Sequence, residues 1–149
     1  MNPRVLFAAL PLFAACLPAL GKDTLAGPVA AEVVRTLDGD TLEVRAQIWL
    51  NQELTTHVRL RGIDTPELHT SCAAEKQMAE TARQRLSALA GNSVSLTLIA
   101  YDKYGGRVDA NIANAAGVDL KTAMLATGLA HPYDGSGARV DWCPVGSVK

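Results

Sequence analysis

Three segments in the first half of the chain carry apolar residues in the pattern of β-strands. Residues 29–37 are rich in Val and Ala, and apolar side chains occupy every second position across residues 41–49. A third segment follows residue 52, carries Arg59 and Arg61 on one face, and ends at Gly62-Ile63. A period of two is typical of half-buried strands. The pattern therefore predicts three consecutive β-strands.

The period then changes to that of a helix. Between residues 71 and 90, apolar side chains recur every three or four positions on a background of Ala, Glu, Gln, Lys and Arg. Ser71 is the predicted N-cap, and Gly91-Asn92 is a stop signal. We expect a helix of several turns directly after the third strand.

The second half of the chain repeats this order on a smaller scale. Strands are predicted at residues 94–98 and 107–113, a short helix over 119–127, and an irregular tail after Gly128. Five short strands with a helix after the third and a short helix after the fifth match the oligonucleotide/oligosaccharide-binding (OB) barrel, within an α+β class. A small sheet with helices on one face is the competing architecture.

The first 21 residues have the features of a secretory signal. Arg4 precedes an uncharged apolar run, too short for a transmembrane helix, and small residues follow at Ala19 and Gly21. We expect residues 1–21 to be a signal peptide and residues 22–149 a single exported domain. Cys16 lies in a segment close to a bacterial lipoprotein site, so a lipid anchor is the alternative; membrane attachment is expected only in that case.

Removal of Cys16 with the signal would leave two cysteines, Cys72 and Cys143. In an oxidising compartment, a disulfide between them is the simplest interpretation. Two unpaired thiols are the alternative.

The net charge argues against tight, non-specific binding of nucleic acid. The full chain carries −1, and loss of Arg4 would make this −2. Proteins that bind nucleic acid non-specifically usually carry excess Lys and Arg, because phosphate neutralisation supplies their affinity. Any binding of nucleic acid must therefore be confined to the site itself. The sequence indicates no stable protein partner, and we expect a monomer.

Three polar stretches lie at predicted strand ends: residues 38–41 (Asp-Gly-Asp-Thr), 59–67 and 102–107. Strand ends meet at one rim of a barrel, so charges far apart in sequence can converge there. A phosphodiester hydrolase needs fixed cations that face the non-bridging oxygens. Arginine donates two parallel hydrogen bonds to phosphate and keeps its charge. Arg59 and Arg107, on different strands, are the candidates.

The acidic residues of these stretches suit a hard divalent cation and a general base. Such ions take carboxylate and carbonyl oxygens, which Asp40, Asp64 and the Thr65 carbonyl would supply. Glu67 would deprotonate the attacking water. Each residue also has an ordinary interpretation: a hairpin turn for residues 38–41 and 102–107, a helix-start acid for Glu67, and a solvated strand face for the arginines.

Together these motifs resemble the thermonuclease family, the staphylococcal-nuclease-like calcium-dependent nucleases. The resemblance runs from about residue 29 to 133 and rests on a DGDT turn, an R-x4-DTPE segment and a D-K-Y-G…R loop, in that order. It implies the same five-stranded barrel. It also implies cleavage of DNA or RNA that leaves 3′-phosphates.

The resemblance implies a role for each residue of the site. Asp40, Asp64 and the Thr65 carbonyl would bind Ca²⁺, Glu67 would be the general base, and Arg59 and Arg107 would contact the phosphate. Tyr104 would lie near the bound nucleotide, with Tyr133 and Lys103 as further substrate-binding candidates.

The chain departs from the family pattern in three respects. A second glycine, Gly106, precedes Arg107, and the chain is slightly acidic without helical periodicity in its tail. The alternative function is a catalytically weak or inactive OB-fold module that binds nucleic acid. A third interpretation is that the carboxylates bind calcium only structurally. Histidine spacing shows no zinc site.

Overall fold

The computed structural model of the chain describes residues 23–103 and 105–143. The predicted signal peptide, Cys16 and Tyr104 lie outside these residues. Within them, neither helix has the length and apolar composition needed to cross a membrane.

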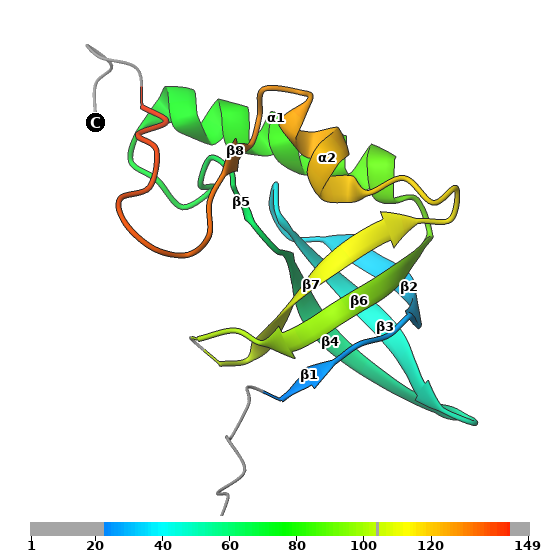
Figure 1. Cartoon of the computed structure of the whole chain (residues 1–149). Coiled ribbons are helices and arrows are strands. Elements are labelled where there is room, and N and C mark those ends of the chain that lie inside the picture. The colour runs from blue at the N-terminus through cyan, green and yellow to red at the C-terminus, as the bar shows by residue number, and fades with distance from the viewer. Residues whose placement is uncertain (1–22, 104, 144–149) are drawn as a thin grey trace, which may run out of the picture.

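Five strands form a closed barrel (Figure 1). Antiparallel pairing joins β2 to β3 and β3 to β4, the parallel pair β4–β7 follows, and β6 closes the ring by pairing antiparallel with both β7 and β2. This closure confirms the predicted five-stranded OB barrel and excludes the open sheet. The strands are β2 (Val29–Thr36), β3 (Thr41–Trp49), β4 (Gln52–Leu60), β6 (Ser93–Tyr101) and β7 (Arg107–Asn114), and a short β1 (Thr24–Leu25) adds to β6.

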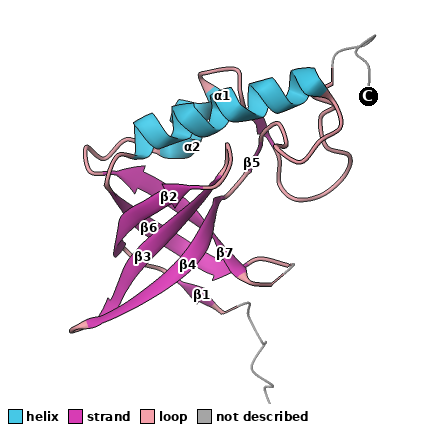
Figure 2. Cartoon of the chain, turned by 180° about the vertical axis from the view of Figure 1, so that it is seen from behind, coloured by secondary structure: helices cyan, strands magenta, loops and turns pink. Residues whose placement is uncertain are grey.

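Two helices, α1 (Ala73–Ala90) and α2 (Leu120–Leu125), lie across one end of the barrel (Figures 1 and 2). They occupy the predicted positions after the third and fifth barrel strands. The helical apolar stripe of α1 buries Ala79, Ala82, Leu86 and Ala90. Small residues in this stripe let the helix approach the barrel closely.

The predicted N-cap of α1 is wrong. Cys72, not Ser71, occupies the N-cap position, and no side chain caps the helix there. The Cys72 N–H instead donates to the Thr70 hydroxyl at 3.2 Å. This bond fixes the backbone that enters α1, but it does not cap the N–H groups of the first helical turn.

The hydrophobic core fills the barrel and continues to the helices at its end. It is made of the inward-facing residues of the strands and the buried faces of the helices, including Leu42, Val44, Val58, Leu60, Leu86, Leu96, Ile112, Leu120 and Met124. These are the apolar positions of the period-two and helical patterns.

The tail is more ordered than its composition predicts. The sequence predicts that strand pairing ends at Gly62-Ile63, but β5 (Ile63–Asp64) pairs antiparallel with β8 (His131–Pro132) from the tail. The Tyr133 N–H also donates to the Gly62 carbonyl at 3.1 Å. A two-residue strand is too short to produce a periodic pattern. The pairing places Asp64 beside the C-terminal segment.

Candidate active site

A cavity of about 530 Å³ opens at one rim of the barrel. Predicted site residues from four separate segments line it: the turn before β3, the end of β4 with the loop that follows, the β6–β7 loop, and the tail. They are Asp40, Arg59, Thr65, Glu67, Lys103, Arg107 and Tyr133. The structure thus brings together groups that lie far apart in sequence.

The turn before β3 places Asp40 in the wall of this cavity. The Asp40 N–H donates to Asp38 Oδ1 at 3.1 Å, and the Leu37 N–H donates to the Thr41 carbonyl at 2.9 Å. A Cβ on Gly39 would lie 2.8 Å from Ala82 Cβ and 2.9 Å from Thr65 Oγ1. Glycine is required because the turn backbone packs directly against α1 and Thr65.

Asp40 is buried, with 4% of its surface exposed. Burial and the nearby charge of Asp38 raise the pKa of Asp40 to about 8, although Arg59 acts in the opposite direction. Its carboxylate accepts hydrogen bonds from the Thr41 hydroxyl at 2.7 Å and forms an ion pair with Arg59 at 2.8 Å. A cation beside this carboxyl would stabilise its ionised form and lower the pKa of Asp40 again.

Arg59 is held at the end of β4. It lies opposite Thr41 in the β3–β4 ladder, and its Nη2 donates to the Ile63 carbonyl at 3.1 Å and to Asp40 Oδ2. The guanidinium therefore has backbone and side-chain partners that fix its orientation. Such a fixed, partly buried cation suits a phosphate oxygen.

Arg107 reaches the same cavity from the start of β7. It forms an ion pair with the buried Asp102, whose N–H donates to the Arg107 carbonyl at 3.2 Å and closes the loop. Gly105 and Gly106 both adopt left-handed backbone conformations, with φ of 73° and 74°. The extra glycine is thus accommodated within the turn, and Arg107 still lines the cavity.

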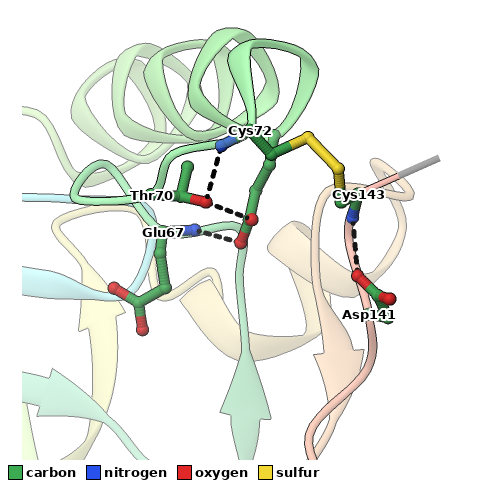
Figure 3. Close-up of a disulfide and its surroundings, with 6 residues drawn as sticks. Glu67, Thr70, Cys72, Asp141 and Cys143 are labelled. Atoms are coloured by element: carbon green, nitrogen blue, oxygen red, sulfur yellow. Dashed lines mark hydrogen bonds between the residues drawn. A yellow bond between two sulfur atoms is a disulfide. The ribbon is translucent and has the colours of Figure 1, made fainter. Parts of the chain in front are cut away.

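Glu67 is positioned by the first turn of α1 (Figure 3). Its N–H donates to Glu75 Oε1 at 3.1 Å, and the Thr70 hydroxyl donates to Glu75 Oε2 at 2.8 Å. The Glu67 side chain points away from this network and is 47% exposed. Glu75 was not predicted, because its sequence context is that of any acidic residue in a first helical turn.

The other two predicted substrate-binding residues that the structure describes, Lys103 and Tyr133, form hydrogen bonds to the tail. Lys103 Nζ donates to the Gly135 carbonyl at 2.8 Å, and the Tyr133 hydroxyl donates to the Gly137 carbonyl at 3.4 Å. Tyr101, which the sequence did not single out, also lines the cavity and is 78% exposed. The tail loop therefore forms one wall of the site.

The structure contains the disulfide between Cys72 and Cys143, the pairing that the sequence predicted (Figure 3). It joins the tail to the start of α1. The neighbouring Trp142 is buried, packs against His131 in a tilted arrangement with ring centroids 4.6 Å apart, and donates its indole N–H to Asp64 Oδ2 at 3.2 Å.

Arg139 of the tail also lines the cavity and was missed in the sequence. Its guanidinium donates to Asp64 Oδ1 at 2.6 Å and bonds the Glu67 carboxylate. The cysteine pair was the available signal. Cys72 lies five residues after Glu67, so a bond from Cys72 to Cys143 brings the residues before Cys143 close to Glu67.

The predicted metal ligands are oxygen donors of the kind that calcium binds. Asp40 and Asp64 are buried carboxylates, and the Thr65 carbonyl accepts from Arg139 Nη2 at 3.2 Å. Residues 23–103 and 105–143 contain no group of three or more His, Cys, Asp or Glu side chains arranged for a metal ion. The predicted set has only two carboxylates and a carbonyl. The Arg139 guanidinium, a cation, already contacts two of these donors, Asp64 and the Thr65 carbonyl. The donors are hard oxygen ligands, which suit a hard divalent ion.

A family model described as staphylococcal nuclease homologue matches residues 57–140. The chain belongs to the staphylococcal nuclease family. The matched span runs from the end of β4 through the tail and includes Arg59, Glu67 and Arg107, whereas the Asp40 turn precedes it. No curated protein was found to match the sequence. As a staphylococcal nuclease homologue, the protein has a nuclease-type function with nucleic acid as its substrate.

Proposed function

We propose that the protein is a calcium-dependent nuclease that hydrolyses phosphodiester bonds of DNA or RNA and leaves 3′-phosphates. One observation carries the proposal: Arg59 and Arg107, from different strands, line the same cavity as Asp40, Thr65 and Glu67. Two arginines and an exposed carboxylate in one cavity suit phosphoryl chemistry better than passive binding.

Each residue has a defined task. Arg59 and Arg107 donate hydrogen bonds to the non-bridging phosphate oxygens, where negative charge grows in the transition state. Glu67 accepts a proton from the attacking water. The water oxygen bonds to phosphorus as the bond to the 5′-oxygen breaks, the leaving 5′-oxygen takes a proton from solvent, and the products are a 3′-phosphate and a 5′-hydroxyl.

Asp40, Asp64 and the Thr65 carbonyl would hold Ca²⁺, which when bound supplies further positive charge at the phosphate and positions water. Lys103, Tyr104 and Tyr133 would contact the substrate outside the scissile phosphate. Local contacts of this kind suit a chain whose net charge is −1.

The test compares the wild type with Glu67→Gln on end-labelled single-stranded DNA, with calcium or with a chelator. We expect the variant to cleave about 10²–10⁴-fold more slowly, the usual loss when a general base is removed. Phosphatase treatment of the products should reveal 3′-phosphates by a shift in mobility. Glu53→Gln, on the exposed part of β4, is the matched control.

Equal cleavage by wild type and Glu67→Gln would exclude this catalytic role. Calcium-independent binding of DNA without cleavage by any preparation would favour the OB-fold binding module instead.

We also propose that the mature chain is exported and monomeric. The Cys72–Cys143 disulfide supports export, because such bonds persist in oxidising compartments. Cell fractionation should place the chain in the periplasm or medium. Membrane association sensitive to Cys16→Ala would indicate the lipoprotein alternative.

A further inference from the structure

Arg139 contacts two of the three groups that the proposed function assigns to the metal, and also the general base. Its guanidinium donates to Asp64 Oδ1 at 2.6 Å and to the Thr65 carbonyl at 3.2 Å, and it bonds the Glu67 carboxylate. A carboxylate, a carbonyl and the base are thus joined by one side chain. Its positive charge lies among oxygens that a calcium ion would need.

Arg139 carries this charge at every physiological pH. Burial of the guanidinium opposes its charge, but hydrogen bonds to Glu67 and Asp64 outweigh burial and raise the pKa of Arg139 above the ordinary arginine value. The guanidinium and a metal ion repel each other, because both are positively charged. An oxygen of Asp64 or Thr65 that accepts from Arg139 also has fewer lone pairs left for a metal ion. Arg139 and a metal ion therefore exclude each other from Asp64 and Thr65.

The residues that carry Arg139 form a segment that we call the strap, residues 134–143. The strap contains neither helix nor strand. The Cys72–Cys143 disulfide and the Trp142 bond to Asp64 anchor its C-terminal end, and the Lys103 bond to the Gly135 carbonyl anchors its other end. Arg139 lies between these anchors, directly over Glu67 and Asp64.

Arg139 can leave these oxygens without loss of any barrel hydrogen bond. Arg59 belongs to β4, whereas Arg139 is on an irregular segment and its side chain is 41% exposed. While the strap is anchored, the guanidinium competes as an intramolecular cation. Tethered groups of this kind act at effective concentrations of roughly millimolar order. That competition raises the calcium concentration needed to fill the site.

We propose that Arg139 controls access of calcium to the site. The guanidinium leaves Asp64 and Thr65 before calcium binds, and the Cys72–Cys143 disulfide keeps it available as a competitor. This inference rests on the proposed function, because it takes Asp64 and Thr65 as metal ligands.

The test is a calorimetric titration of calcium into the purified, oxidised full chain without nucleic acid. Arg139→Gln removes the charge and keeps an amide donor for the buried Asp64. We expect it to bind calcium about tenfold more tightly than wild type, the factor that corresponds to loss of one charge-assisted contact. Arg139→Lys should remain near wild type. Arg45→Gln, an exposed arginine on β3 that pairs with Glu32, should not change affinity.

Equal calcium binding by Arg139→Gln would mean that Arg139 does not compete with calcium, and weaker binding would mean that it supports the site. Either result would overturn the proposal. Thermal melts show whether each variant is folded. If Arg139→Gln does not fold, reduction of the wild-type disulfide provides the second arm. Reduction should tighten calcium binding in wild type; unchanged or weaker binding would overturn the role of the disulfide as a tether. Where Arg139→Gln folds, reduction should leave its affinity unchanged.

Cleavage assays on the same preparations separate the two proposals. If cleavage needs calcium and Glu67 while Arg139→Gln binds calcium no more tightly, only the Arg139 inference fails. If Arg139→Gln gains affinity but no preparation cleaves DNA, the proposed function fails and the competition stands. Absence of calcium binding in every variant overturns both.

Discussion

The barrel rim and the strap both contribute to the same cavity, but different forces hold them. Rim residues such as Arg59 and Arg107 belong to strands whose backbones pair on both sides. The strap has no strand or helix and is anchored by a disulfide and a few side-chain bonds. Rim positions are therefore set by the fold itself, whereas strap positions depend on contacts that can break separately. We expect rim changes to affect chemistry and strap changes to affect access.

Among the changes that separate the rim strands from the strap, removal of a rim arginine should have the largest effect. Arg59→Ala should lower kcat/KM about hundredfold or more, because one fixed cation at developing phosphate charge is worth roughly that factor. Steady-state cleavage at saturating calcium measures the effect. Arg45→Ala removes an exposed arginine from β3 and should leave the rate near wild type. A similar loss in both variants would show that the effect is not local to the rim.

The raised pKa of Asp40 predicts opposite effects of pH on stability and on metal binding. Between its ordinary value of 3.8 and about 8, Asp40 is protonated in the folded chain and ionised in the unfolded chain. The folded state then binds more protons, so the metal-free protein loses up to about 1.4 kcal/mol of stability per pH unit as pH rises through this window. Chemical denaturation of wild type and Asp40→Asn measures this slope, which the variant should lack.

Calcium must displace the same proton if Asp40 is a ligand. The apparent calcium affinity should therefore rise about tenfold per pH unit up to about pH 8 and level off above it. Titrations at pH 6, 7 and 8, with pH set by non-chelating buffers, measure this. A flat profile would show that Asp40 does not give up a proton on metal binding.

Gly39→Ala tests how closely the rim turn packs against α1. The new Cβ would lie 2.8 Å from Ala82 Cβ, and overpacking of this kind costs about 1–3 kcal/mol. Denaturant melts measure the loss. Ala82→Gly alone should cost about 1 kcal/mol through helix propensity. The double variant should lose less stability than the sum of the two single losses, because the methyl group that opposes the new Cβ is gone. Strict additivity would mean that the contact with Thr65 alone decides the cost.

The smallest effect should come from Glu75, which orients Glu67 without lying in the cavity. Glu75→Ala removes the acceptor for the Glu67 N–H and the Thr70 hydroxyl. We expect kcat to fall by up to about tenfold with little change in KM, since the loss of a single positioning contact is modest. Glu75→Gln keeps one acceptor oxygen and should recover part of the rate. A change confined to KM would indicate a role in substrate binding instead.

Local patterns predicted most of the fold. The period-two segments correspond to the barrel strands and the helical stripe corresponds to α1, because one-sided burial imposes those periods on the sequence. The Ser71 cap was wrong, because α1 begins one residue later, with Cys72 at the N-cap position and no side-chain cap. The β5–β8 pair was missed, because two residues cannot show a period.

The sequence by itself determined the barrel and the residues of its rim, because strand periodicity and short motifs are local properties. It could not place Arg139 on Asp64, a contact between residues 75 positions apart. Only the tertiary structure decided that contact, through the β5–β8 pair, the buried Trp142 and the Cys72–Cys143 bond. The physical reason is that an irregular segment carries no period, so its place depends entirely on the distant groups that it meets.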